Sequence, residues 1–241
     1  MRRILMYVLL TLLLFARPGD PHVNAQESCD QPGGGDGGGG CLPSENPPST
    51  NCTWDPVTCN WVGCDDTPVI VDLDGDGFDL TDANHGVDFD LDGNGIKTRF
   101  SWTSEDSDDA WLTLDRNGNG VVDNGIELFG NYTPQPAPPP DTERNGFLAL
   151  AVYDANGDGT IDSQDPIFTN LRLWQDHDHN GISEAEELHT LAELKILAID
   201  IDYRLSKKTD RYGNRFRYKA RVHDARGANV GHWAYDVFLL R

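Results

Sequence analysis

The segment DANGDGTIDSQD at residues 154–165 and the segment DHDHNGISEAEE at residues 176–187 are two copies of one pattern. In each copy Asp or Asn stands at positions 1, 3 and 5, Gly at position 6, and a carboxylate at positions 9 and 12. A hard cation such as Ca²⁺ takes roughly six to eight oxygen ligands at about 2.3–2.6 Å, so a short segment must wrap around it with alternate residues pointing inward. The two copies therefore predict a pair of calcium-binding loops.

The ligands expected in each loop occupy positions 1, 3, 5, 7, 9 and 12. In the first loop they are Asp154, Asn156, Asp158, Thr160, Asp162 and Asp165. In the second loop they are Asp176, Asp178, Asn180, Ile182, Glu184 and Glu187. The second loop also contains His177 and His179, which stand at positions 2 and 4 and are expected to point away from the ion.

Two earlier acidic turns keep only part of the pattern. The turn at residues 72–83 has Ala83 at position 12, so it either binds weakly, borrows an acid such as Asp79 or Asp82, or serves only as a polar turn. The turn at residues 90–101 ends on Ser101, which is also not an acid. Their candidate ligands are Asp72, Asp74 and Asp76 in the first and Asp90, Asp92 and Asn94 in the second.

A third partial turn follows at residues 115–127, and here the closing acid arrives one residue late. Ile126 stands at position 12 and Glu127 at position 13. A backbone bulge at Gly125 would return Glu127 to the site, and glycine makes such a bulge cheap. Binding is favoured over a purely structural turn. The candidate ligands are Asp115, Asn117, Asn119, Asp123 and Glu127.

Helix and strand signals surround these turns. The apolar run 147–153 predicts a helix that enters the first regular loop, and the capping box Ser183-Glu-Ala-Glu186 predicts a second helix that continues to Leu194. Strands are expected at residues 68–71, 111–114, 171–175, 196–203, 215–222 and 232–239. The sequence thus predicts an α+β fold in which calcium loops with short helices and strands are closed by a C-terminal antiparallel β-meander.

The N-terminal third predicts an exported protein. Residues 1–25 combine two arginines, a short apolar run and a terminal Ala25, which is typical of a cleaved secretory signal peptide, with an uncleaved anchor as the alternative. The protein is therefore expected to be secreted, periplasmic or at the cell surface. Residues 26–66 hold a Gly-rich tether and all five cysteines, Cys29, Cys41, Cys52, Cys59 and Cys64, which favour disulfides over zinc and leave one thiol over.

The other expected divisions are a partial-loop region at 67–133, a Pro-rich linker at 134–142, the paired loops at 143–195 and the meander at 196–241.

The net charge of -21 argues against a nucleic-acid partner, because most of the surface would repel it. Within the meander, Arg215, Arg217, Lys219 and Arg221 alternate with apolar residues. This basic stripe either binds an extracellular protein or acidic polysaccharide, lies against the acidic loops of the same chain, or is a solvated sheet face.

The motifs VDLDGDGFDLT, FDLDGNG, LDRNGNGVVDNGIELFG, YDANGDGTIDSQD, LWQDHDHNGISEAEELHTL and YDVFL span roughly residues 68–241. They resemble those of EF-hand calcium-binding proteins, specifically the secreted bacterial type with several DxDxDG loops. The resemblance implies EF-hand-like loops, Ca²⁺ as the cofactor, and calcium that mainly stabilises the fold. The alternative is a dockerin-like or polysaccharide- or protein-binding module on the cell surface, and the absence of a nucleophile elbow, an HExxH motif and a phosphate loop predicts no enzyme activity.

Overall fold

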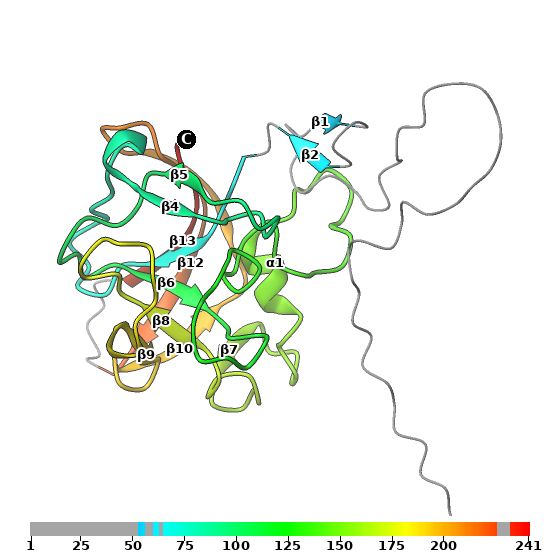
Figure 1. Ribbon diagram of the computed structural model, residues 1–241. Helices are drawn as coiled ribbons and strands as arrows, with labels where there is room; N and C mark the ends of the chain where they lie inside the picture. Colours follow the sequence, from blue (N-terminus) through cyan, green and yellow to red (C-terminus); the bar gives the residue numbers. More distant parts are fainter. Residues whose placement is uncertain (1–52, 56–59, 63–64, 226–231) are drawn as a thin grey trace, which may run out of the picture. The chain divides into compact units, whose positions relative to one another are not determined.

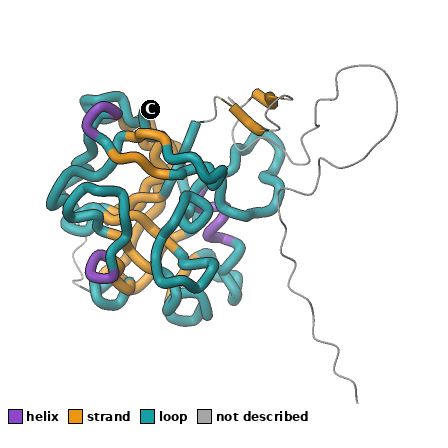
Figure 2. The backbone as a smooth tube through the Cα atoms, viewed as in Figure 1, coloured by secondary structure: helices purple, strands orange, loops and turns teal. Residues whose placement is uncertain are grey.

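The computed structural model describes residues 53–55, 60–62, 65–225 and 232–241, which form a largely antiparallel β structure (Figures 1 and 2). The strands of the main sheet are β3 (Val69–Val71), β6 (Ala110–Thr113), β7 (Thr160–Asp162), β8 (Arg172–Trp174), β9 (Leu188–Thr190), β10 (Ile196–Asp200), β11 (Arg204–Thr209), β12 (Arg215–Asp224) and β13 (His232–Phe238). Two hairpins are separate from it, β1 (Thr53–Asp55) with β2 (Asn60–Val62) and β4 (Val87–Phe89) with β5 (Thr98–Phe100). The predicted signal peptide, the Gly-rich tether and all five cysteines lie outside the described residues.

The main sheet joins strands that are far apart in the sequence. Its order is β7-β10-β12-β13-β3-β6-β8-β9, with β11 also paired to β12, and every pairing between neighbours is antiparallel. Strand β3 lies between β13 and β6, where Ile70 pairs with Tyr235 on one side and with Trp111 on the other. The sheet therefore draws its strands from the partial-loop region, the paired-loop region and the C-terminal region alike.

Both faces of this sheet are covered by apolar residues. Alternate residues of a strand point to opposite faces, so Val69 and Val71 contribute to one cluster while Ile70 contributes to the other. The first cluster, which we call the helix-side core, also contains Phe147 and Leu150 of the helix α1 (Gly146–Ala151). The second cluster, which we call the tryptophan core, contains Trp102, Trp111 and Trp174, with Phe89 packed against them, all fully or almost fully buried.

The predicted α+β class is wrong, because the described residues contain one short α-helix, α1, and otherwise strands and loops. The helix expected before the first regular loop exists as α1, and Asn145 caps it by accepting the amides of Phe147 and Leu148. Two other helical segments are single 3₁₀ turns, η2 (Ala83–His85) and η3 (Ala185–Glu187). Tertiary pairing of short β-rich segments has overridden the local helix signals.

The helix expected from Ser183 to Leu194 illustrates the cause. The hydroxyl of Ser183 contacts the backbone of Val122 in another loop, so it is not available to cap a helix. After η3 the chain enters β9, and Thr190 then forms a tight turn with Glu193, whose carboxylate accepts both the amide and the hydroxyl of Thr190. The segment therefore extends along β8 and does not coil.

The C-terminal region contains four strands and not the three expected. A register shift between Phe216 and Tyr218 in the pairing of β12 with β13 places Phe216 in the tryptophan core and Tyr218 in the helix-side core. The alternation expected from the sequence is therefore confirmed for Tyr218, Ala220 and Val222, which share the helix-side core, and is wrong for Phe216. The bulge divides the basic residues into a group that lies over Phe238, formed by Arg215 and Arg217, and a group that lies over Trp233, formed by Lys219 and Arg221.

Among the residues whose structure is described, no helix is long and apolar enough to cross a membrane. The sequence predicts no such span after the N-terminal apolar run, because no later stretch approaches roughly 20 apolar residues.

Candidate metal sites

The first regular loop is closed by its last acid. Asp154 accepts the backbone amides of positions 4 and 6 at 2.8 and 2.9 Å, where the two glycines have φ angles of 72° and 87°. Asp165 is only 2 % exposed, and its two oxygens accept the amides of Ala155 and Asp162 at 2.8 and 3.0 Å. The acid at position 12 thus ties position 2 to position 9 and closes the turn.

The second regular loop brings three carboxylates together. Asp176 accepts the amides of positions 5 and 6, and Glu187 accepts the amide of His177 at 2.8 Å and the indole N–H of Trp174 at 3.1 Å. One carboxylate oxygen from each of Asp176, Asp178 and Glu187 lies within 4.8 Å of the others. Burial raises the pKa of both Asp176 and Glu187, because it disfavours the charged form of each carboxyl group.

The histidines of this loop do not join the carboxylates. His177 is exposed, and the ring nitrogens of His179 contact the backbone oxygens of Thr103 and His85 at 2.5 and 2.6 Å. The imidazole of His179 therefore links the loop to η2 and to the segment after β5, in agreement with the expectation that it points away from an ion.

In the loop at residues 115–127 the late acid takes the closing role. Glu127 is 3 % exposed and accepts the amides of Arg116 and Asp123 at 3.0 and 2.8 Å. These are positions 2 and 9, the same positions that donate to the closing acid of the first regular loop. Glycine is required at Gly125 because a Cβ atom there would lie 1.9 Å from the backbone oxygen of Leu91. The extra residue is thus accommodated by a close approach between two acidic turns.

The loop at residues 90–101 has a well-formed start and no closing acid at position 12. Asp90 accepts the amides of positions 5 and 6 at 3.0 and 2.9 Å. Ser101 is buried and its hydroxyl contacts Asn214 at 2.5 Å, so it faces away from the loop. This turn retains the local geometry of the pattern without its final ligand.

The loop that begins at Asp72 does not use the acids that its own sequence offered. Asp82 caps η2 by accepting the amide of His85 at 2.9 Å. Asp79 is exposed, and Ala83 at position 12 begins η2. The two acids proposed as borrowed ligands are therefore placed at the surface and at a helix cap.

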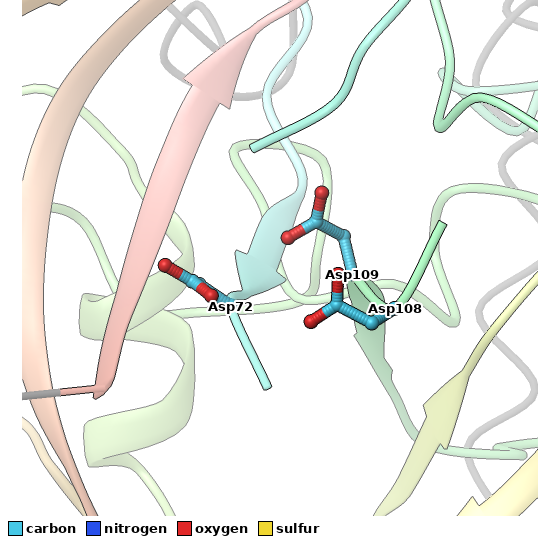
Figure 3. A group of neighbouring side chains, drawn as sticks. All are labelled: Asp72, Asp108 and Asp109. Atoms are coloured by element: carbon cyan, nitrogen blue, oxygen red, sulfur yellow. The ribbon is translucent and has the colours of Figure 1, made fainter. Parts of the chain in front are cut away.

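Two acids from a distant segment meet this loop instead. The carboxylate of Asp108 accepts the amide of Asp74 at 2.8 Å, and that of Asp109 accepts the amide of Asp79 at 2.8 Å. Carboxylate oxygens of Asp72, Asp108 and Asp109 all lie within 4.8 Å of one another. Figure 3 shows the three side chains near one another, with Asp72 at the end of β3 and the other two at the start of β6.

Asp109 is the least solvated member of this cluster. It is 1 % exposed, its Oδ2 accepts hydrogen bonds from Asp79 and from the hydroxyl of Ser107, and its Oδ1 is buried with no hydrogen-bond partner. Burial, followed by the charges of Asp108 and Asp72, raises the pKa of Asp109 to about 8. Burial also raises the pKa of Asp72 and of Asp108. Three crowded carboxylates with one unsatisfied oxygen form an arrangement that a cation would stabilise.

Strand pairing explains why these acids meet. Val71 at the end of β3 pairs with Ala110 at the start of β6. The residue after β3 and the residues before β6 therefore lie beside each other where these two strands end. The sequence signal that could have revealed them is the acidic run SEDSDD at 104–109 directly before an apolar strand. Sequence reasoning missed Asp108 and Asp109 because it searched for ligands within twelve residues of Asp72.

Most of the other predicted ligands line exposed turns. Among the described residues, the carboxylate clusters are those of Asp72 with Asp108 and Asp109 and of Asp176 with Asp178 and Glu187. Side chains at positions 3 and 5 are exposed in most loops, as in Asp74, Asp76, Asn94, Asn117, Asn119, Asn156, Asp158, Asp178 and Asn180. Several pair through an amide, for example Asn156 with Asp158 at 2.8 Å.

The loop at residues 176–187 is joined to the loop at residues 115–127 through position 8 of each. The amide of Val122 donates to the hydroxyl of Ser183 at 2.6 Å in a buried setting. Position 8 of the first regular loop, Ile161, pairs with Ile199 of β10. The two regular loops, adjacent in sequence, are therefore not joined to each other through this position.

Replacing Ser183 with Ala should lower the free energy of unfolding by about 1–3 kcal/mol, because the buried amide of Val122 loses its acceptor. Ser163, an exposed residue in the first regular loop, provides a matched Ser→Ala control that should change stability by less than about 0.5 kcal/mol. Urea unfolding followed by tryptophan fluorescence would measure the free energy of unfolding of both variants. Equal stabilities for the two variants would contradict the link between the loops.

A known protein family matches the part of the sequence that forms the main sheet. The model of the SPM domain family matches residues 69–239, from the first residue of β3 to just beyond β13. The iron-regulated protein FrpA of Neisseria meningitidis serogroup C is similar, with 43 % identity over 149 residues. That alignment covers 61 % of this chain but 13 % of FrpA, so the chain corresponds to a small part of that relative. Because the family model spans most of the sequence, the chain belongs to the SPM domain family.

Proposed function

We propose that this protein binds Ca²⁺ through its acidic loops and that the ions mainly stabilise the β-sheet fold. The observation that carries the proposal is the cluster of Asp72, Asp108 and Asp109, in which a nearly fully buried carboxylate keeps one oxygen without a partner. Ionising a buried carboxyl group without a partner costs several kcal/mol, and a bound cation would offset that cost.

The type of ligand favours calcium over a transition metal. The carboxylate clusters of the described residues contain Asp and Glu only, without His or Cys. Hard cations prefer such oxygen ligands, whereas iron, copper and zinc are usually held with nitrogen or sulfur ligands. Repetition of the same oxygen-rich turn supports Ca²⁺ over Mg²⁺, because Ca²⁺ accepts larger and less regular ligand sets.

The position of the clusters supports a structural role. Asp72 follows β3 while Asp108 and Asp109 precede β6, so an ion there would cross-link adjacent strands of the main sheet. Glu187 receives a hydrogen bond from Trp174 of the tryptophan core, so an ion in the second regular loop would be coupled to that core. Metal binding that joins separate segments contributes directly to folding free energy.

Calcium removal and re-addition would test this proposal. The purified chain, stripped with a chelator and titrated with CaCl₂ in a calorimeter, should bind several ions, which native mass spectrometry would count. The thermal midpoint should rise with calcium, and tryptophan emission should change because Trp174 contacts Glu187. An absence of both bound calcium and any shift in the midpoint at millimolar CaCl₂ would overturn the proposal.

We also propose that the protein is exported, on the strength of its N-terminal sequence, and that its role is binding and not catalysis. An extracellular protein or acidic polysaccharide as partner stays a prediction for the two basic groups of β12, and disulfides stay a prediction for the cysteines. The dockerin-like alternative has less support, since the residues after Asp165 form turns and then β8 where a dockerin would need a long outgoing helix.

A further inference from the structure

Lys208 of strand β11 is exposed, and its ammonium lies over three aromatic rings, which we call the aromatic box. Its ammonium nitrogen is 4.5 Å from the ring centre of Phe78, 4.9 Å from that of Phe216 and 5.5 Å from that of Tyr235. The rings also contact one another, with centroid distances of 4.9 Å between Phe78 and Phe216 and 5.3 Å between Phe78 and Tyr235. The electron-rich faces of such rings attract a cation and hold it in place.

The box connects Lys208 to the cluster of Asp72, Asp108 and Asp109. Phe78 stands at position 7 of the loop that begins at Asp72, and Tyr235 pairs with Ile70 of β3, the strand that leads into that loop. Burial lowers the pKa of Lys208, and the negative charges of Asp72 and Asp109 oppose that effect. The contact with Phe78 therefore holds a positive charge beside the loop that begins at Asp72.

We infer that Lys208 is a built-in counter-cation that sets the affinity of the Asp72 cluster for Ca²⁺; this rests on the proposed function. A divalent ion placed between the three carboxylates meets the ammonium as a like charge, and the repulsion weakens binding. In the metal-free protein the same charge offsets part of the repulsion among the carboxylates. Lys208 therefore narrows the difference in stability between the metal-free and the calcium-bound forms.

The cluster of Asp72, Asp108 and Asp109 contains a buried oxygen that a cation could coordinate. Oδ1 of Asp109 is buried without a hydrogen-bond partner, and one carboxylate oxygen of Asp109 lies within 4.8 Å of oxygens of Asp72 and Asp108 (Figure 3). The ammonium of Lys208 does not satisfy this oxygen, since it is held over the rings. Lys208 thus acts on the cluster through space.

The test is a calcium titration of the full chain with Lys208 replaced by Met, which keeps a long apolar side chain against the rings and removes the charge. Calcium affinity at one site should rise about fivefold at low salt, and the gain should shrink at high salt because screening weakens the repulsion. Lys208→Arg keeps the charge and should bind within about twofold of wild type. Lys207→Met removes the same charge from the next residue, which lies over none of the three rings, and should also stay within about twofold.

Two results separate the inference from the function on which it rests. If Asp109→Asn leaves the number of bound ions unchanged, the Asp72 cluster is not a calcium site and the proposed function loses its main support. If Asp109→Asn removes one ion while Lys208→Met, Lys208→Arg and Lys207→Met all bind like wild type, calcium binding stands and the role of Lys208 is overturned. An equal gain in Lys208→Met and Lys208→Arg would also overturn it, because the charge would then not be the cause.

Discussion

Replacing Asp109 with Asn should abolish the stabilisation that calcium gives through the Asp72 cluster, while the metal-free protein stays at least as stable as wild type. The amide side chain introduced by this substitution retains one oxygen for the hydrogen bonds from Asp79 and Ser107, and it cannot ionise in the buried position. A ligand at about 100 times its dissociation constant contributes ~2.7 kcal/mol. For a domain of this size that corresponds to roughly 5–10 °C in the thermal midpoint.

Thermal unfolding with CaCl₂ and with chelator measures this effect as the difference between the two midpoints. Asp106→Asn is the matched control, because Asp106 is an exposed acid in the same segment and its φ of 58° is one that Asn tolerates. The control should keep the full calcium-dependent shift. A normal shift in Asp109→Asn would mean that calcium stabilises the fold entirely through other loops.

Replacing Asp236 with Asn should remove a large pH dependence of stability. Asp236 is fully buried in β13, where Oδ2 accepts the amide of Gly146 at 2.6 Å and the hydroxyl of Thr67 at 3.2 Å while Oδ1 has no partner. Burial raises the pKa of Asp236 to about 7. The folded protein therefore binds this proton more tightly than the unfolded chain, whose ordinary value is 3.8.

The direction in which stability changes with pH follows from the difference between these two pKa values. The stability contributed by protonated Asp236 is fully present below about pH 4 and is lost as the pH rises through about 7. Roughly three pKa units separate the two values, which corresponds to ~4 kcal/mol at about 1.4 kcal/mol per unit. Asp236→Asn is neutral at every pH, so its stability relative to wild type should increase from pH 5 to pH 8.

Urea unfolding in calcium-free buffer at several pH values would measure the difference between Asp236→Asn and wild type. The control is Asp141→Asn, which changes an exposed acid in the Pro-rich linker and should run parallel to wild type. A constant difference between Asp236→Asn and wild type across this range would show that Asp236 is ionised in the fold or does not affect it.

The sequence allowed the local parts of the structure to be predicted. The apolar runs before Asp72 and Asp115 are the strands β3 and β6, and the run before Asp176 is β8. Glu127 also closes its loop from the predicted position. These features depend on residues that are close in the chain, where spacing alone determines which atoms can meet.

The helical part and the full ligand set could not be predicted in the same way. Ser183 begins a capping-box sequence that is typical of a helix start, yet its hydroxyl contacts Val122, which is 61 residues away. Asp108 and Asp109 reach the Asp72 loop only because β3 pairs with β6. Both outcomes depend on which strands become neighbours, and a single sequence contains no direct measure of that choice.

The place of β13 in the sheet has a consequence for how the chain is made. This strand is near the end of the printed sequence, yet it lies between β12 and β3 and is the strand that joins the C-terminal strands to the rest of the sheet. During synthesis β3 and β6 leave the ribosome well before their neighbour exists, and such non-local pairings form slowly. Completion of the sheet must therefore wait until β13 has been synthesised, and until then the edge of β3 that pairs with β13 has no partner strand.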